Sequence, residues 1–195
     1  MPDSITKIGQ AAFCGCQNLT RIHLPNRLSS IDIQTFDSCR RLTNIHLPSS
    51  IKEINHWAFA RTGLSSFCFP INVEKIGWGL FAGTQIKIIN SESESIIVRD
   101  RAIYSNRGKT LSQYYGNEKK FVIPEGVEEI SKLSFTSYIK EIIFPKSINK
   151  LCDMIWYDGT IPEKIYVHKE LKKIILEYLP EYYYSHVFVT EDDCN

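Results

Sequence analysis

A spacing of 22 or 23 residues recurs along the first half of this 195-residue chain and constrains its fold more than any other feature. Aliphatic, aromatic and proline positions each keep this spacing, so chance is a poor explanation. The positions are Ile8, Ile31, Ile54 and Ile76; Phe13, Phe36, Phe59 and Phe81; and Pro25, Pro48 and Pro70. A period of this length is typical of a solenoid, in which each repeat is one unit stacked on the next.

The stretch LTRIHLP at residues 19–25 shows how one unit folds. Ile22 and Leu24 are two residues apart and share one face of an extended strand, while His23 points to the other face. Pro25 ends the strand because proline has no N–H to donate to a ladder. The next aliphatic residues and the phenylalanine lead the chain back across the convex side. One unit cannot enclose its apolar side, so units stack and their strands form a parallel sheet on the concave face.

The period is interrupted after a degenerate fourth copy. Residues 95–115 read SIIVRDRAIYSNRGKTLSQYY, which predicts two strands around a turn at residues 106–109. The repeat resumes with FVIPEGVEEI at residues 121–130 and IKEIIFP at residues 139–145. We therefore expect a hairpin island inserted into the array of repeats.

The C-terminal segment predicts a cap for the array. KIYVH at residues 164–168 is typical of a last strand. Pro180 is expected to end the helix that follows, and the tyrosines at 182–184 either pack the cap or form an aromatic interaction patch. The residues at helical spacing, which predict an amphipathic helix covering the open end, are Leu171, Ile174, Ile175, Tyr178 and Leu179.

Together these patterns predict an α/β-type repeat solenoid, an arc of roughly six to seven leucine-rich repeats. We expect a parallel concave β-sheet, an inserted β-hairpin island and a C-terminal capping helix. The expected single domain over residues 1–195 divides into N-terminal repeats (1–94), the island (95–120), C-terminal repeats (121–168) and a helical cap (169–190).

The unit L-x-x-I-x-L-P-x-x-L-x-x-I-x-x-x-A-F-x-x-C resembles the repeat of the BspA-like (TpLRR-type) leucine-rich-repeat family. It occurs here as LTRIHLPNRLSSIDIQTFDSC and LTNIHLPSSIKEINHWAFART, and the hairpin followed by IPEGVEEI also fits that family. The resemblance implies an arc-shaped, non-catalytic scaffold for protein–protein interaction. Members typically sit on bacterial or protozoan surfaces, which implies a cell-surface adhesin or surface antigen that binds host or neighbouring-cell proteins.

The start of the chain favours a second interpretation. Aligned with later repeats, Met1 and Pro2 fall at the end of a strand, so the first sheet edge has no N-terminal cap. We expect either a C-terminal portion of a longer array or another element over that edge. No secretion signal is visible. If Met1 is the true start, the alternative is a cytoplasmic leucine-rich-repeat scaffold or regulatory module.

Charge and composition limit the classes of partner that this chain is expected to bind. Lysine plus arginine (23) nearly balances aspartate plus glutamate (22), which predicts no nucleic-acid partner. No apolar run approaches the roughly 18 residues of a membrane-spanning helix, so no membrane insertion is expected. The six cysteines lack the paired spacing of a zinc site, and no cofactor is predicted. The expected partners are proteins.

His23, His46 and Cys68 occupy the same slot in three successive repeats. They could bind zinc, or act as base and nucleophile of a hydrolase. Parallel side chains do not converge as a tetrahedral site requires, and nothing marks an oxyanion hole. We therefore expect no catalytic, cofactor-binding or metal-binding residues and no enzymatic activity. The predicted concave interaction surface consists of Arg21, His23, Asn44, His46, Ser66, Cys68 and Glu141.

Overall fold

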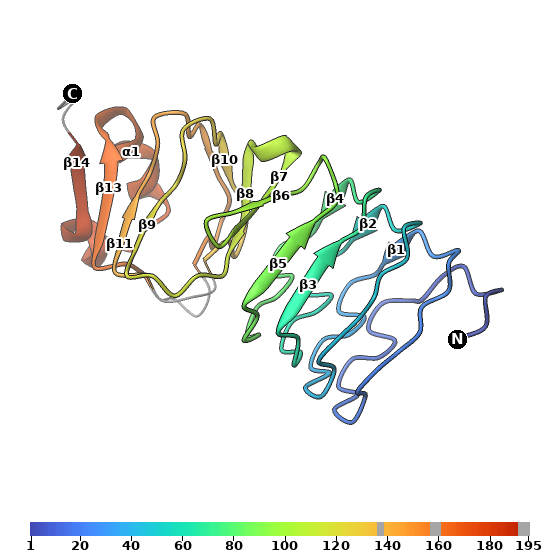
Figure 1. Cartoon of the computed structure of the whole chain (residues 1–195). Coiled ribbons are helices and arrows are strands. Elements are labelled where there is room, and N and C mark those ends of the chain that lie inside the picture. The colour runs from blue at the N-terminus through green and yellow to red at the C-terminus, as the bar shows by residue number, and fades with distance from the viewer. Residues whose placement is uncertain (136–138, 157–160, 191–195) are drawn as a thin grey trace.

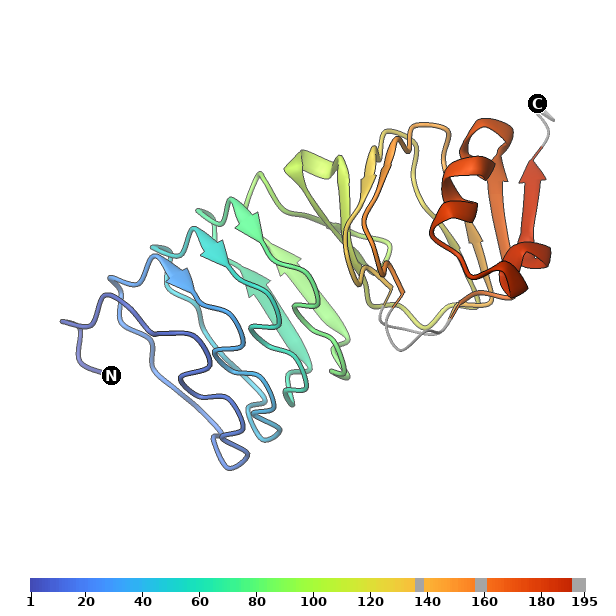
Figure 2. The same cartoon turned by 180° about the vertical axis from the view of Figure 1, so that it is seen from behind.

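The computed structural model describes residues 1–135, 139–156 and 161–190. These residues form an elongated solenoid whose two ends carry the two termini (Figure 1). Strands lie on two opposite sides of the solenoid. We call the sheets facing the viewer in Figure 1 the front sheets, and those facing the viewer in Figure 2 the rear sheets.

Within the described residues, each side carries two separate sheets. One front sheet contains β3 (Ser66–Phe69) and β5 (Ile88–Ser91), and the other contains β9 (Lys120–Val122), β11 (Glu141–Ile143), β13 (Lys164–His168) and β14 (Val187–Thr190). One rear sheet contains β1 (Ser30–Ile31), β2 (Glu53–Ile54) and β4 (Lys75–Ile76), and the other contains β6 (Ile97–Arg99), β7 (Ala102–Ser105), β8 (Thr110–Tyr114), β10 (Glu129–Ile130) and β12 (Lys150–Leu151).

Successive repeats pair in parallel and in register. Ile31 in β1 pairs with Ile54 in β2, which pairs with Ile76 in β4. The repeat length of 22 or 23 residues is therefore one turn of the solenoid, which advances by about 4.8 Å, the spacing of neighbouring strands.

A column of phenylalanine rings runs beside this ladder. Ring centroids lie 5.4 Å apart for Phe13 and Phe36, 5.6 Å for Phe36 and Phe59, and 6.0 Å for Phe59 and Phe81. The planes of successive rings differ by 7°, 4° and 15°, so the rings stack nearly parallel. Phe59 is fully buried inside the column, whereas Phe13 at its end is half-buried. Each repeat thus completes the burial of its neighbour.

The strands of the first two repeats differ from the prediction. Residues 19–25 and 42–48 form no strand, whereas the third copy forms β3 and ends before Pro70 as expected. Burial still alternates, because Leu24 and Leu47 are buried while His23 and His46 are exposed. Packing sets that alternation, whereas a strand also needs backbone hydrogen bonds between neighbours. In these repeats the backbone hydrogen bonds between neighbouring repeats form instead at the isoleucines of β1 and β2.

The island contains three antiparallel strands, β6, β7 and β8, one more than predicted. Its turn falls at Asn106–Gly108, as the sequence predicts, with Asn106 and Arg107 in the left-handed region at φ 51° and 54°. β8 pairs in parallel with β10, so the island begins the second rear sheet. Ile103 of β7 packs into the first core, whereas its neighbours Ala102 and Tyr104 pack into the second. One strand thus divides two hydrophobic cores.

The strand predicted at residues 164–168 is confirmed as β13, and the helix α1 (Lys169–Glu177) follows it. Leu171 and Ile175 of α1 are buried, and the helix ends before Pro180. α1 lies on the rear side of β13 and β14 (Figure 2).

The expected helical cap over residues 169–190 is only partly helical. After α1 the chain forms the short 3-10 helix η2 (Glu181–His186) and then β14, which pairs in parallel with β13. The last element of the described residues is therefore a strand, because four residues of high β propensity return to the sheet after the proline. Tyr182 is 73% exposed and Tyr184 is 41% exposed, so these two rings do not pack the cap.

The phenylalanine column predicts a graded effect on stability. We expect Phe59→Ala to lower the free energy of unfolding by about 3–5 kcal/mol, because it leaves a cavity between two stacked rings. Phe13→Ala removes a half-buried ring with one neighbour in the column and should cost less. Urea denaturation followed by circular dichroism measures both changes. Equal losses in the two variants would contradict a column in which each interior ring is stabilised from both sides.

Candidate interaction surfaces

The sequence-predicted surface residues lie on the front side, but not in one group. Ser66 pairs with Ile88 and Cys68 pairs with Asn90 across β3 and β5, and all four side chains are exposed. The equivalent earlier positions are also exposed; they are Arg21, His23, Asn44 and His46. Glu141 lies in β11 of the other front sheet. The structure therefore groups six of the seven residues and separates Glu141, and their binding role stays a prediction.

Glu141 belongs to a charged row on the second front sheet. Lys120, Glu141 and Lys164 occupy paired positions on β9, β11 and β13. The Lys164 ammonium lies 3.2 Å from the Glu141 carboxylate, and this hydrogen bond raises the pKa of Lys164. A pair this exposed to water contributes little to the stability of the fold. Its main effect is to hold the charged side chains along one line of the sheet.

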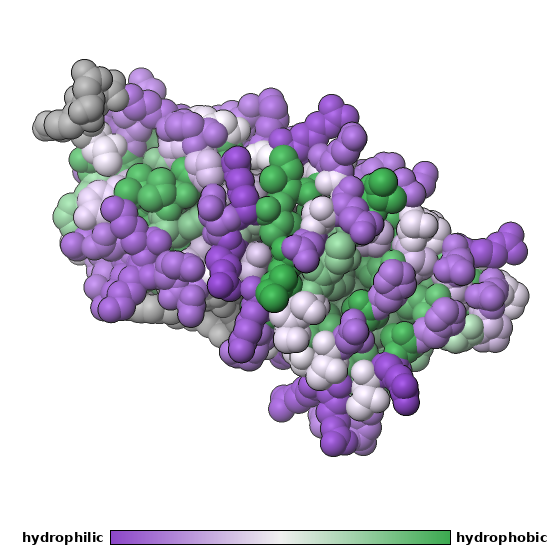
Figure 3. Space-filling model, in the orientation of Figure 1, coloured by the Kyte–Doolittle hydropathy of each residue, from purple (hydrophilic) through white to green (hydrophobic). Residues whose placement is uncertain are grey.

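An apolar row lies two residues further along the same strands. Val122, Ile143, Tyr166 and Phe188 are paired across β9, β11, β13 and β14. Val122 is 52% exposed and Phe188 is 42% exposed, while the rings of Tyr166 and Phe188 lie 5.5 Å apart. Figure 3 shows apolar surface gathering over these C-terminal strands between hydrophilic areas. Contiguous exposed apolar surface marks interaction sites on soluble proteins.

Sequence analysis missed this row because repeat matching assigns apolar residues to the core. The signal that could have found it is the loss of alternation. In residues 142–144 and 165–167 every position is apolar or aromatic, so both faces of the strand carry such side chains. A strand with one face in water normally alternates apolar and polar residues.

The repeat position shared by His23, His46 and Cys68 has few features of a catalytic or metal-binding site. Partial shielding from water, with a smaller contribution from the nearby Glu92 carboxylate, raises the pKa of the largely exposed Cys68 thiol. A nucleophilic cysteine needs the opposite shift, because the thiolate is the reactive form. Within the described ranges, no group of three or more histidine, cysteine, aspartate or glutamate side chains is placed to hold a metal ion.

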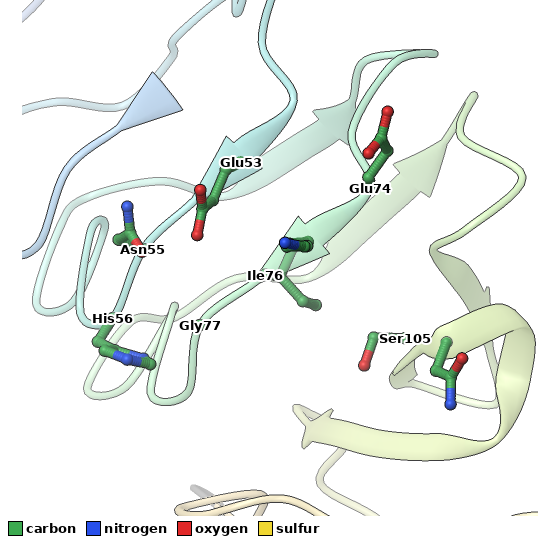
Figure 4. Close-up of a pocket in the computed structure, with 9 residues that line it drawn as sticks. Glu53, Asn55, His56, Glu74, Ile76, Gly77 and Ser105 are labelled. Atoms are coloured by element: carbon green, nitrogen blue, oxygen red, sulfur yellow. The ribbon is translucent and has the colours of Figure 1, made fainter. Parts of the chain in front are cut away.

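A polar pocket of about 460 Å³ opens beside the first rear sheet. Figure 4 shows that its lining comes from β2, β4 and the end of β7, with Glu53 and Glu74 on the strand side and Ser105 opposite them. Asn106 of the island turn also lines it. The pocket exists because the island, and not another repeat, follows β4 in space. The carboxylates, the amide and the hydroxyl in this lining can form hydrogen bonds to the polar groups of a ligand.

His56 also lines this pocket and joins two repeats. Its Nδ1 accepts a hydrogen bond from the Trp78 backbone N–H at 3.0 Å, and its ring stacks on the Trp78 ring at 4.5 Å. Gly77 is required there, because a Cβ at that position would overlap the backbone nitrogen of His56. Burial lowers the pKa of His56; the nearby Glu53 carboxylate raises this pKa by a smaller amount, and the Lys132 ammonium lowers it further. The neutral imidazole is the form that accepts from Trp78.

The stacked repeats and the parallel ladders define a leucine-rich-repeat protein. The family profile described as BspA type Leucine rich repeat region matches residues 1–110 and 109–185, in six copies. The chain belongs to this family. The family resemblance and the repeat fold expected from the sequence are thereby confirmed.

Solved structures share the architecture. A leucine rich cell surface protein from Faecalibacterium prausnitzii is 27% identical, with a TM-score of 0.73 over 84% of this chain and 45% of that one. The pneumococcal vaccine antigen PcpA is 26% identical, with a TM-score of 0.64 over 74% of this chain and 38% of that one. A leucine-rich repeat protein from Bacteroides ovatus, 23% identical with a TM-score of 0.57 over 87% of this chain and 48% of that one, supports the fold alone.

This chain spans less than half the length of each of those three. No curated protein matches it. Among the described residues, no helix has the length and apolar character needed to cross a membrane.

The lowered pKa of His56 predicts that the stability of the folded chain depends on pH. Its pKa in the folded chain lies below its ordinary value of 6.5, so the unfolded chain binds more protons between these two values. Stability should therefore fall as the pH drops below 6.5 and continue to fall down to the folded pKa. His56→Asn places an amide oxygen near the position of Nδ1 and should flatten this slope. Denaturation from about pH 8 to pH 5 measures it, and an equal slope in both proteins would assign the effect to other groups.

Proposed function

We propose that this chain is a non-catalytic scaffold that binds protein partners through its front sheets. The observation that carries this proposal is the apolar row from Val122 to Phe188, which is exposed at both ends and half-buried between them, on a sheet fixed by stacked repeats. The nearly neutral net charge does not favour a polyanion, and paired charges flank the row. An amphipathic protein segment, with apolar residues over the row and polar residues over the charges, fits this surface.

We further propose that residues 1–195 act as one leucine-rich-repeat domain displayed at a cell surface, as an adhesin or surface antigen. The similarity to a leucine rich cell surface protein and to a vaccine antigen supports this location. The partner would then be a protein of a host or a neighbouring cell. The repeats supply a rigid frame, and partner choice depends on the exposed side chains.

Substitution of the apolar row tests the binding proposal. We expect Val122→Ser combined with Tyr166→Ser to weaken binding of a protein captured from host or neighbouring-cell surfaces by at least about tenfold. The change removes exposed apolar area and should leave the core intact. Ile71→Ser is the matched control, because Ile71 is 58% exposed outside the strands. Surface plasmon resonance measures the affinities, and unchanged binding by the double variant would reject the row as the contact.

The sequence-predicted group is tested with the same partner. Arg21→Ala, His23→Ala and Asn44→Ala are combined in one variant, since these side chains are exposed on the same side of the first repeats. Weaker binding would extend the contact along the solenoid to the first repeats. Unchanged binding would discard these positions and leave the second front sheet as the binding surface.

Surface display is tested on intact cells that produce the chain. Added protease should remove the chain while a cytoplasmic marker protein remains whole. A chain that stays protected until the cells are broken would support the intracellular scaffold instead.

A further inference from the structure

Two cysteines occupy the same position in the first two repeats. Cys16 and Cys39 lie 23 residues apart, and each follows the column phenylalanine of its repeat by three residues. Threonine takes this position in the next two repeats, at Thr62 and Thr84. Cys39 is fully buried, so packing explains a small, weakly polar side chain there. Cys16 is exposed, and packing does not explain its thiol.

The backbones of these two repeats run side by side in parallel. The Gly15 N–H donates to the Asp37 carbonyl at 2.8 Å, which places Cys16 beside Cys39. Parallel backbones joined by such hydrogen bonds lie about 4.8 Å apart. The Cα atoms of a disulfide lie about 4.4–6.8 Å apart. The spacing of the two repeats therefore suits a disulfide between these positions.

The thiol of Cys39 points toward the first repeat. Its Sγ donates to the Phe13 carbonyl at 3.0 Å, and the Cys16 N–H donates to the same oxygen at 3.1 Å. The hydroxyl of Thr62 behaves differently, because it donates to the Phe59 carbonyl of its own repeat. The Cys39 sulfur thus lies next to the backbone of Cys16. The exposed Cys16 side chain can adopt the rotamer that meets this sulfur.

We propose that Cys16 and Cys39 form a disulfide that fastens the first repeat to the second when the chain meets a low-molecular-weight disulfide oxidant. The bond lies beside the contact between the rings of Phe13 and Phe36. The Cys39 thiol gives up its hydrogen bond to Phe13, but a thiol is a weak donor, and the Cys16 N–H still donates to that carbonyl. This goes beyond the proposed function, because it holds whether or not the chain binds another protein.

Two thiol–disulfide exchange steps form the bond. The thiolate of the exposed Cys16 attacks one sulfur of the oxidant, whose S–S bond breaks, and the released thiolate takes up a proton. Cys39 then loses its proton to solvent, and its thiolate attacks the Cys16 sulfur. This attack releases the second half of the oxidant, which also becomes a thiol. The two protein thiols thereby lose two electrons and two protons, and the oxidant is reduced to two thiols.

The second of these steps is expected to be the slow one. Burial raises the pKa of the Cys39 thiol to about 11, and a nearby Cys16 thiolate adds to this shift. The thiolate is the attacking form, so only a small fraction of Cys39 can react at neutral pH. A mixed disulfide on Cys16 should therefore accumulate before the bond between the repeats closes.

Peptide mapping of the oxidised chain tests the pair directly. The reduced chain is incubated with oxidised glutathione, free thiols are alkylated, and the monomer band of a non-reducing gel is digested with trypsin. Trypsin releases Cys39 on residues 28–40, and it releases Cys14 and Cys16 together on residues 8–21. Mass spectrometry should find these two peptides linked, and fragmentation should place the link on Cys16. The absence of this link, or a link through Cys14, would overturn the proposal.

Matched variants separate the roles of the three thiols. Cys39→Thr carries the residue found at this position in later repeats, and it should retain glutathione on Cys16 as a mixed disulfide. Cys16→Ser should abolish the link, whereas Cys14→Ser should form it as the parent chain does. Circular dichroism verifies that each variant is folded. A Cys16→Ser chain that still joins the two peptides, or a folded Cys14→Ser chain that does not, would contradict the assignment.

Urea denaturation tests whether the bond fastens the repeats. A cross-link removes conformational freedom from the unfolded chain, so the oxidised parent should unfold at a higher urea concentration than the reduced parent. Cys39→Thr treated with the same oxidant should show no such increase, since it cannot form the bond. If the oxidised parent contains the bond yet unfolds at the same or a lower urea concentration, the stabilising role is rejected.

Discussion

The stacking of one repeat on the next is the interaction on which the rest of this structure depends. Phe59 is fully buried because Phe36 and Phe81 lie against its two faces. The isoleucine ladder of β1, β2 and β4 keeps the same register. Neither set could be buried by a single repeat, so cooperation between neighbours, and not local strand propensity, holds the short strands in place.

The island interrupts the stacking of repeats and separates the two halves of the chain. It ends the first core at Ile103 and starts the second at Ala102 and Tyr104, so each half of the chain packs its own interior. It also leaves strands beside it without a repeat as neighbour, which creates the polar pocket between β4 and the end of β7. The polar pocket therefore arises where the regular array is interrupted, because no further repeat lies beside β4 there.

Sequence analysis predicted the parts that repeat. The 22- or 23-residue period predicted which isoleucines pair in the core. The proline predicted the end of β3, and the NRGK segment predicted the island turn. It missed β14, since four residues after a helix and a proline carry no repeat motif. It grouped Glu141 with His23, because a linear pattern does not show that the island separates their sheets. It missed His56, whose contact with Trp78 depends on the side-chain geometry of two different repeats.

The same division between stacked and free positions explains how such a scaffold can choose a partner. In the first repeats His23 and His46 are exposed while the leucines beside them are buried. Substitution of the exposed residue leaves the ladder and the ring column unchanged, whereas substitution of the buried one opens a cavity. In the second front sheet, apolar residues also occupy the exposed positions, which stacking does not require. Their presence outside the core is therefore best explained by contact with another protein surface.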